Sequence, residues 1–382
     1  MKIVVNTGVL LHDNSEYYRN FLNEVLEIII NRNREHEFII LTEDADIKKF
    51  LFSSNVTKVI RRNTLRNSLL VKIWYDIKLP YILKKYKADL FVSFDEFCSL
   101  TTRRPQCVLL NDLSLLSYSS PGSRPHLFFY KHFLHRMIQR ADVLVCWSDF
   151  KKKDLMLRYS AKEKKFCVVY PAAQEIFQPL NEAAKEEVRK NYCDEKSYFI
   201  YAGTIQQRND LLNLLKAFSV FKKRQQSNWK LVLAGNRSQY SKKFMDDLRS
   251  YKYRSDVVMA TDEKQDDAAR LIGSAYALIC VAYADGSVFP ILQALRCQVP
   301  IVAADTSAAR EIAGDAALYA NPADPENMAD QMMVLYKDES LRTTLIEKGK
   351  TAGSRYSLDK SAELLWRCIC RTCADYKPPD MI

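Results

Sequence analysis

The sequence predicts an α/β protein built from two doubly wound domains, and three observations support this fold class. Short, continuously apolar segments alternate with helical patterns along the chain, which predicts parallel sheets covered by helices on both faces. The alternation pauses at residues 170–180, where two prolines bracket a polar turn before the pattern resumes. The length of 382 residues accommodates two domains of ordinary size.

The elements follow in order. The apolar segment at the N-terminus is too short for a signal peptide and is expected to be the first strand. In the first half, strands are expected at residues 3–5, 37–41, 58–60, 90–93, 107–110 and 143–146, with helices at 17–30, 69–86 and 126–140. In the second half, strands are expected at residues 198–202, 230–234, 257–259, 277–280 and 300–303, with helices at 209–226, 241–253, 268–274 and 289–296.

These elements define three parts of the chain. Residues 1–170 are expected to form an N-terminal domain and residues 171–357 a C-terminal domain, with a last helix within residues 358–382. Ser148 precedes a further helical pattern and is expected to be its N-cap, since a serine hydroxyl accepts a hydrogen bond from a first-turn N–H group.

Positive charge is concentrated in the first half. The net charge is +11, and residues 1–170 hold 28 Lys and Arg against 18 Asp and Glu, whereas residues 171–382 hold 29 against 28. Both a solvated basic surface and an anionic partner of the first half remain open. The segments 61–87 and 123–140 mix basic and apolar residues, which is compatible with docking on anionic lipid headgroups but is also typical of a helix with one core face. The basic residues follow no nucleic-acid-reading motif, so no nucleic-acid partner is expected.

The ten cysteines provide evidence on the cellular compartment of the protein and on whether it binds a metal. They fall mostly inside expected strands and helices without a disulfide-like spacing, which indicates reduced thiols and a cytoplasmic protein. Cys368, Cys370 and Cys373 share one expected helix, but this spacing without a second cluster is a weak zinc signal, and no metal site is expected. No apolar segment approaches the ~18–20 residues that span a bilayer.

The most informative segment is residues 282–304, which read AYADGSVFPILQALRCQVPIVAA. It resembles the nucleotide-sugar site of the group 1 family of retaining glycosyltransferases. That family usually has a Glu before Gly-Phe-Gly and a second Glu eight residues later, and here Asp285 and Gln293 occupy the two acidic positions. The resemblance is strong over residues 198–336 and weaker before residue 170. A well-packed turn and helix without a ligand is the other interpretation of the segment.

The resemblance implies a fold and an activity. The implied fold is GT-B, with two Rossmann-like domains facing across a cleft and the last helix crossing back to the first domain. The implied activity is transfer of a sugar from a nucleotide-sugar to a glycan or lipid-linked glycan, with retention of configuration and with neither a metal nor another cofactor. Such a protein is expected to be cytoplasmic, and peripheral docking on the inner face of the membrane stays open. The alternative is a catalytically impaired or inactive relative that acts as a partner or scaffold in glycan assembly.

The resemblance also selects site residues, although several depart from the family pattern. The donor-binding candidates follow two strand ends and are Gly203, Thr204, Arg208, Asn209, Gly286, Ser287, Val288, Phe289 and Gln293. Arg208 suits phosphate oxygens, although a surface or helix-starting role is also open, and Asn209 replaces a Lys and removes one positive charge from the leaving diphosphate. The amide of Gln293 suits ribose hydroxyls.

Two residues are the catalytic candidates. Asp285 keeps a carboxylate but is one methylene shorter than the Glu of the family, which moves the charge by more than ~1 Å. Asn111 stands where many relatives have the His of a His-Asp pair, and an Asn donates a hydrogen bond but takes up no proton. The clustering of such changes at functional positions is what motivates the inactive alternative.

Overall fold

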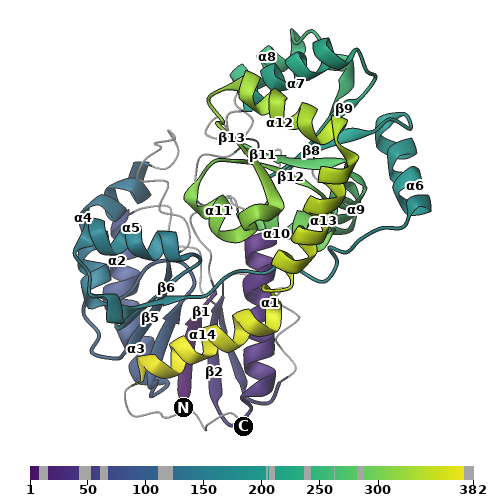
Figure 1. Ribbon diagram of the computed structural model, residues 1–382. Coiled ribbons are helices and arrows are strands. Elements are labelled where there is room, and N and C mark those ends of the chain that lie inside the picture. Colours follow the sequence, from purple (N-terminus) through teal and green to yellow (C-terminus); the bar gives the residue numbers. More distant parts are fainter. Residues whose placement is uncertain are drawn as a thin grey trace. The chain divides into compact units, whose positions relative to one another are not determined.

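The computed structural model describes residues 1–7, 16–42, 53–60, 68–110, 124–203, 205, 211–235, 242–261, 263–281 and 288–373. The chain divides into two compact units (Figure 1). Unit 1 comprises Met1–His12, Tyr18–Pro171 and Leu358–Ile382, and unit 2 comprises Asp13–Tyr17 and Ala172–Ser357. Apart from the short segment Asp13–Tyr17, unit 2 is therefore one continuous segment, after which the chain returns to unit 1.

Unit 1 contains a parallel sheet of seven described strands in the order β3-β2-β1-β4-β5-β6-β7. The strands are β1 (Lys2–Asn6), β2 (Glu37–Thr42), β3 (Val56–Ile60), β4 (Leu90–Ser93), β5 (Gln106–Leu110), β6 (Val143–Cys146) and β7 (Phe166–Val168). Every residue of β4, β5 and β6 is buried, as expected for strands covered by helices on both faces. Six of these strands match the predicted segments, whereas the three-residue β7 was not predicted.

The described helices of unit 1 are α1 (Glu16–Arg32), α2 (Ser68–Ile73), α3 (Leu79–Lys85), α4 (Arg124–Arg140), α5 (Asp149–Tyr159) and α14 (Leu358–Thr372). Ser148 is the N-cap of α5, and its side chain accepts a hydrogen bond from the Lys151 N–H at 3.1 Å, which confirms the predicted cap. The core on one face of the sheet joins Trp74, Leu79 and Leu134 to strand residues such as Phe91 and Val108.

The single helix predicted for residues 69–86 is wrong in one respect, because a π-helical turn at Trp74–Lys78 separates α2 from α3. The Leu79 N–H donates to the Trp74 carbonyl, five residues back. Pro80 follows at once, and a proline has no N–H and its ring crowds the carbonyl four residues earlier, which here is that of Asp76. The hydroxyl of Thr101 donates to this Asp76 carbonyl at 2.6 Å, so the freed acceptor is satisfied.

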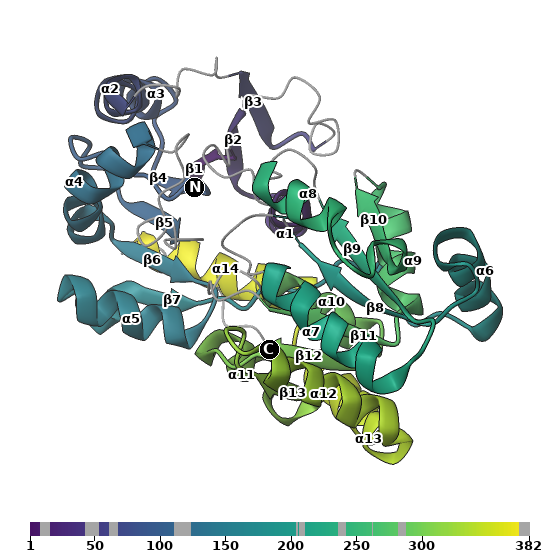
Figure 2. The same cartoon turned by 90° about the horizontal axis from the view of Figure 1, so that it is seen from above.

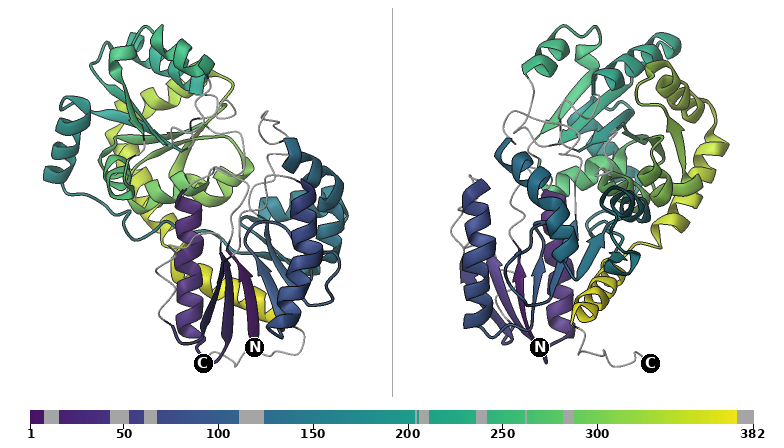
Figure 3. Two further views of the ribbon diagram at one scale, coloured as in Figure 1. Left: turned by 180° about the vertical axis from the view of Figure 1, so that it is seen from behind. Right: turned by 90° about the vertical axis from the view of Figure 1, so that its left-hand side faces the viewer.

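The last helix, α14, packs on β5 and β6 of unit 1 and crosses one face of the sheet (Figures 1 and 3). Leu365 and Ile369 are buried in this contact. Trp366 stacks on His36 with ring centroids 5.2 Å apart. The Ser361 hydroxyl donates to the Tyr170 carbonyl at 2.7 Å, so the start of α14 is bound to the segment by which the chain leaves the unit.

Unit 2 contains a second parallel sheet, with six described strands in the order β10-β9-β8-β11-β12-β13. The strands are β8 (Tyr198–Ala202), β9 (Lys230–Gly235), β10 (Val257–Thr261), β11 (Ala277–Cys280), β12 (Ile301–Ala304) and β13 (Ala317–Ala320). The described helices are α6 (Glu182–Cys193), α7 (Leu211–Gln225), α8 (Lys242–Arg249), α9 (Gln265–Ser274), α10 (Val288–Arg296), α11 (Ser307–Ala313), α12 (Pro325–Lys337) and α13 (Glu339–Gly353). The strand β13 was not predicted.

The core of unit 2 is rich in aromatic residues. Phe199 of β8 packs edge-to-face on Phe221 of α7, with ring centroids 5.0 Å apart, and Trp229 packs on Tyr276 at 4.7 Å. Helices α7 and α12 lie side by side (Figure 2), and Tyr336 of α12 reaches Phe221 at 5.7 Å. None of the described helices has the length and apolar character needed to cross a lipid bilayer.

Candidate functional site

The strand order places the predicted donor segments of unit 2 at the same edge of its sheet. From β8 the chain continues to β9 on one side, whereas β11 lies on the other side, so the strand order reverses between β8 and β11. In open parallel sheets, ligands bind outside the carboxyl ends of the strands at such a reversal. Gly203 directly follows β8, and Val288 begins α10, the first helix after β11. The predicted donor residues of the described part therefore flank the topological switch point.

Four of the predicted site residues are described: Gly203, Val288, Phe289 and Gln293. The other seven, Asn111, Thr204, Arg208, Asn209, Asp285, Gly286 and Ser287, lie outside the described residues. Gly235, at the end of β9, joins the described four because of its contact with Gly203. We call the set of Gly203, Gly235, Val288, Phe289 and Gln293 the unit 2 edge.

Two glycines bring the backbone of neighbouring strands very close together at this edge. Gly203 has φ +144°, a conformation that side-chain-bearing residues rarely adopt, and its N–H donates to the Ala234 carbonyl at 2.9 Å. A Cβ atom on Gly235 would lie 1.9 Å from the Gly203 carbonyl oxygen. Gly235 must therefore be a glycine for the segment after β8 to start where it does. The sequence analysis had no signal for it beyond the Leu-Ala-Gly strand end.

Gln293 is the unusual side chain of the unit 2 edge. It lies in α10 and is only 2% exposed. Its Oε1 atom is buried and accepts no hydrogen bond in the described structure. A buried acceptor without a donor costs about 1–3 kcal/mol, so the position favours a ligand that brings an O–H or N–H group. Val288 and Phe289, at the start of the same helix, are also buried.

The start of α10 adds a favourable place for negative charge. The first N–H groups of a helix have no acceptor inside the helix, and the helix dipole is positive at this end. The described residues of unit 2 include no buried Asp or Glu. The start of α10 is therefore suited to an anion such as a phosphate.

The unit 1 sheet also reverses its strand order, but different side chains lie at the carboxyl ends of its central strands. Its strand order reverses between β1 and β4. Asn6 is the last residue of β1, Ser93 is the last of β4, and Asp95 and Glu96 follow directly. We call Asn6, Tyr75, Ser93, Asp95 and Glu96 the unit 1 edge.

Asp95 is the centre of the hydrogen bonds at the unit 1 edge. Its carboxylate accepts from the Asn6 amide at 2.6 Å, from the Ser93 hydroxyl at 2.5 Å and from the Tyr75 hydroxyl. Asp95 is 4% exposed and Glu96 is 2% exposed. Glu96 also has φ +69°, a left-handed conformation that is uncommon for residues other than glycine. Two carboxyl groups are thus buried at the carboxyl ends of the central strands.

The pKa of Tyr18 in α1 is affected by the negative charge of Asp95 and Glu96. Burial raises the pKa of Tyr18 well above its usual range, and the nearby carboxylates of Glu96 and Asp95 raise it further. These residues were not among those predicted from the sequence. Polar residues directly after a fully buried strand, as in Ser93-Phe94-Asp95-Glu96, were the available signal.

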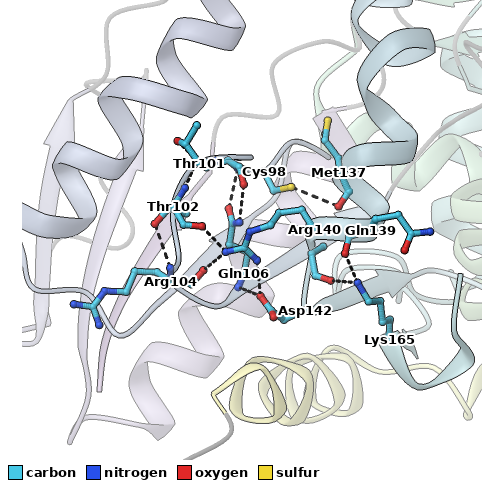
Figure 4. Close-up of polar contacts among 12 residues, drawn as sticks. Cys98, Thr101, Thr102, Arg104, Gln106, Met137, Gln139, Arg140, Asp142 and Lys165 are labelled. Carbon is cyan, nitrogen blue, oxygen red and sulfur yellow. Dashed lines mark hydrogen bonds and ion pairs between the residues drawn. The ribbon is translucent and has the colours of Figure 1, made fainter.

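The opposite edge of the unit 1 sheet is satisfied by its own hydrogen bonds (Figure 4). The Arg140 guanidinium donates to the Thr102 and Arg104 carbonyls at 2.6 and 2.9 Å, and it pairs with Asp142 at 3.1 Å. The Gln106 amide accepts from the Ser99 N–H and donates to the Ser99 carbonyl, both at 2.8 Å. These contacts hold loop backbone at the amino ends of β5 and β6, which is a structural role.

Lys165 completes this opposite edge (Figure 4). Its ammonium donates to the carbonyls of Ile138 and Ala141 at the end of α4, at 3.4 and 2.8 Å. A cation at this position compensates the unpaired carbonyls of the helix C-terminus. Burial lowers the pKa of Lys165 from its ordinary value. The polar groups of this edge therefore serve the fold, in contrast to Gln293.

The comparisons with known proteins agree with the fold. Residues 183–352 match the family described as Glycosyl transferases group 1. The chain is 20% identical over 268 residues to the O-antigen chain mannosyltransferase B of Escherichia coli, spanning 70% of this chain and 68% of that protein. It is 19% identical over 224 residues to the O-antigen chain mannosyltransferase RfbU of Salmonella typhimurium, spanning 59% of each.

Solved structures match over nearly the whole chain. A glycosyltransferase from Rickettsia africae has a TM-score of 0.74 at 14% identity, covering 98% of this chain and 99% of that one. WaaG, a glycosyltransferase of lipopolysaccharide biosynthesis, has a TM-score of 0.72 at 14% identity, with 95% and 98% covered. Anabaena Alr3699/HepE in complex with UDP and glucose has a TM-score of 0.71 at 14% identity, with 97% and 99% covered. These matches confirm the predicted GT-B fold.

Proposed function

Residues 183–352 belong to the group 1 glycosyl transferases, and from this premise we propose that the chain transfers a sugar from a nucleotide-sugar to a hydroxyl of a glycan or lipid-linked glycan, with retention of configuration and without a metal. The observation that carries the proposal is that this family segment contains the unit 2 edge, where Gln293 presents a buried acceptor without a donor. A ribose hydroxyl of the donor nucleotide is a suitable partner for this atom.

The donor diphosphate is assigned to the unit 2 edge. Gly203 and Gly235 have no side chains of their own where the two strand ends approach, which suits close approach of phosphate oxygens to backbone. The start of α10 supplies helix N–H groups, and Arg208 is the proposed side-chain cation. During transfer the bond from the sugar to the diphosphate breaks, so charge develops on the leaving phosphate. Stabilising this charge is the main electrostatic task of the site.

The acceptor is assigned to unit 1, with Asn111 retained as the proposed contact to the reacting sugar and Asp285 as the proposed carboxylate on the donor side. The carboxylates of the unit 1 edge repel a phosphate and suit groups that donate hydrogen bonds, as sugar hydroxyls do. The two O-antigen mannosyltransferases among the relatives support a glycan acceptor and make mannose the first donor sugar to test.

Docking on an anionic membrane surface is a further part of the proposal. Leu70, Ile77 and Tyr81 are exposed by 44%, 64% and 68% on the helical segment of residues 68–85. Lys84 and Lys85 are exposed on the same segment. Exposed apolar side chains flanked by lysines suit the headgroup region of an anionic bilayer. In contrast, Phe133, from the second segment proposed for docking, packs against the core and faces Lys72 at 4.8 Å.

The test is a thermal-shift titration of the full chain with UDP, GDP and ADP, followed by a transfer assay with the sugar nucleotides of the base that binds. A ligand at a hundredfold excess over its Kd stabilises the folded protein by about 2.7 kcal/mol. We expect one nucleotide to shift the melting temperature, and Gln293→Leu to weaken that shift. Gln331→Leu, in α12 of the same unit, is the matched control.

The outcomes separate the two functions that the sequence left open. Nucleotide binding with sugar transfer supports the enzyme. Binding without transfer to any tested acceptor leaves the donor assignment standing and moves the question to the acceptor. No shift with any nucleotide at millimolar concentration overturns the proposal and favours the alternative, a non-catalytic partner or scaffold in glycan assembly.

A further inference from the structure

Three cysteine side chains meet between the unit 1 sheet and α14. Cys107 belongs to β5, Cys167 to β7 and Cys368 to α14. The strand pairing aligns Leu109 with Val145 and Val145 with Cys167, so Cys107 and Cys167 lie on the same face of the sheet. The Arg371 guanidinium of α14 donates to the Cys167 sulfur at 3.3 Å, and α14 packs on β5 and β6, which places α14 on that face.

Cys167 has the surroundings of a reactive thiol. It is half-buried, and the Arg371 guanidinium lies 3.3 Å from its sulfur atom. The hydrogen bond from Cys368 and the positive charges of Arg371 and Lys152 lower the pKa of Cys167 to about 7, although burial opposes them. Lys152 is itself paired with the exposed carboxylate of Glu163 at 2.8 Å. The thiolate form, which is the nucleophile, is therefore well populated at neutral pH.

Cys368 has the opposite character. It is 4% exposed, and its hydrogen bond to Cys167 together with its burial raise its pKa well above the usual range. Cys368 keeps its proton and donates it toward Cys167. Burial raises the pKa of Cys107, on the same face of the sheet, to about 12. One thiolate thus faces thiols that stay protonated.

We propose that Cys167 and Cys368 form an oxidation site in which Cys167 attacks a hydroperoxide and Cys368 resolves the product as a disulfide. In the first step the Cys167 thiolate forms a bond to one peroxide oxygen, the O–O bond breaks, and the leaving alkoxide or hydroxide takes a proton. In the second step the Cys368 sulfur attacks the sulfenic acid, the S–O bond breaks, and water leaves with the Cys368 proton. Two thiols are oxidised and one peroxide is reduced.

Because of where Cys167 and Cys368 lie in the chain, a disulfide between them would enclose the long unit 2 segment. Cys167 lies four residues before the end of the first long segment of unit 1 at Pro171, and Cys368 lies ten residues after the chain returns at Leu358. The Ser361 hydroxyl already binds the Tyr170 carbonyl between them. The disulfide closes a covalent ring that contains all of residues 172–357. It joins the unit 1 residues that directly precede and follow the long unit 2 segment Ala172–Ser357.

A metal site is a weaker interpretation of these cysteines. Within the described ranges, no group of three or more His, Cys, Asp or Glu side chains is arranged to hold a metal ion. Arg371 beside Cys167 also disfavours a cation there.

The first experiment measures thiol reactivity in the unmodified full chain. The protein is alkylated with iodoacetamide between pH 5.5 and 9.5, and the modification of each cysteine is followed by peptide mass spectrometry. We expect Cys167 to react about tenfold faster at pH 7 than any other cysteine, with a rate that rises with pH to a midpoint near its pKa of about 7. A Cys167 rate no greater than that of Cys373, the other half-buried thiol, would overturn the proposal.

The second experiment tests the disulfide with hydrogen peroxide as the oxidant. We expect a Cys167–Cys368 linked peptide and slower hydrogen exchange of the backbone at residues 168–172 and 357–361. Cys368→Ala should leave a sulfenic acid at Cys167 that dimedone traps, and Arg371→Gln should raise the midpoint of the Cys167 pH profile. Cys370→Ser, which changes a buried thiol of the same helix, is the control and should keep the link. Oxidation that joins other cysteines, or none, contradicts the proposal.

Discussion

The two sheets of this chain share a topology and differ in the chemistry of their carboxyl edges. The unit 1 edge contains the buried carboxyl groups of Asp95 and Glu96, and Asp95 is satisfied by three hydrogen bonds from the protein. The unit 2 edge contains two closely approaching glycines and the buried Gln293 amide, whose carbonyl has no donor. One fold therefore has one edge whose buried acceptor is satisfied by the protein and one edge whose buried acceptor is not.

The largest expected effect comes from breaking the unit 1 edge with Asp95→Ala. The change removes the carboxylate that accepts hydrogen bonds from the buried donors of Asn6, Tyr75 and Ser93. Hydrogen bonds to a charged group contribute about 1.5–3 kcal/mol, so we expect a loss of about 3 kcal/mol in the free energy of unfolding. Urea denaturation followed by tyrosine and tryptophan fluorescence measures it.

Asp142→Ala is the control for this change because its carboxylate lies at the opposite, partly exposed edge of the same sheet. We expect it to cost about 1 kcal/mol, since exposed pairs contribute little. Equal losses for the two variants would contradict the special role of the carboxyl edge.

The next effect is expected at the unit 2 edge with Gly235→Ala. The new methyl group would lie 1.9 Å from the Gly203 carbonyl oxygen, so the backbone after β8 must move. We expect a loss of about 2 kcal/mol in stability together with weaker nucleotide binding, measured by thermal shift with and without the nucleotide. Gly349→Ala in α13 is the control, because its Cβ meets only Leu295 at 3.4 Å, and alanine is the better helix former by about 1 kcal/mol. A Gly235→Ala protein that binds nucleotide normally would show that the close approach is not needed.

Gln293→Leu tests the comparison through two quantities, because it should lower nucleotide affinity without lowering stability. Removing a buried acceptor that has no donor should leave stability unchanged or raise it by up to about 1 kcal/mol. Nucleotide affinity should fall about tenfold, which corresponds to the loss of one good hydrogen bond. The same thermal-shift titration reports both quantities. A clear loss of stability without nucleotide would mean that Gln293 serves the fold, as Asp95 does.

The smallest effect is a pH dependence that belongs to unit 1, because residues 172–357 contain no histidine. Burial lowers the pKa of His36, and the N-terminal amine lowers it further. The unfolded chain therefore takes up a proton at a higher pH than the folded chain. The contribution of His36 to stability should be constant above about pH 6.5 and should fall as the pH drops below that value, toward the lower pKa of the folded state. Urea midpoints at pH 8, 6.5 and 5 measure the slope, and His36→Gln should flatten it.

Much of the fold could be predicted from the sequence because strands buried on both faces are continuously apolar, as β4 to β6 are. The strands that were missed, β7 and β13, are short and end a sheet, and only some of their residues are buried. The π-helical turn at Trp74–Lys78 was also missed, because apolar spacing does not reveal a change in hydrogen-bond register.

The candidate site was predicted only in part, and that part came from a family motif and not from the apolar pattern that predicted the strands. Gln293 and Gly203 were found through a family motif, which records function directly. Gly235 and Asp95 were not found, because their roles depend on contacts with residues 32 and 89 positions away, Gly203 and Asn6. Such contacts exist only once the strands have been placed side by side.

The return of α14 to unit 1 fixes an order of events during synthesis. Residues 172–357 form a nearly continuous unit and are all available before α14 leaves the ribosome. Unit 1 begins first but lacks the helix that covers β5 and β6 until residue 372 has been added. The half of the protein that is translated first is therefore the half that is completed last, and until then its apolar sheet face and Cys167 are open to chaperones.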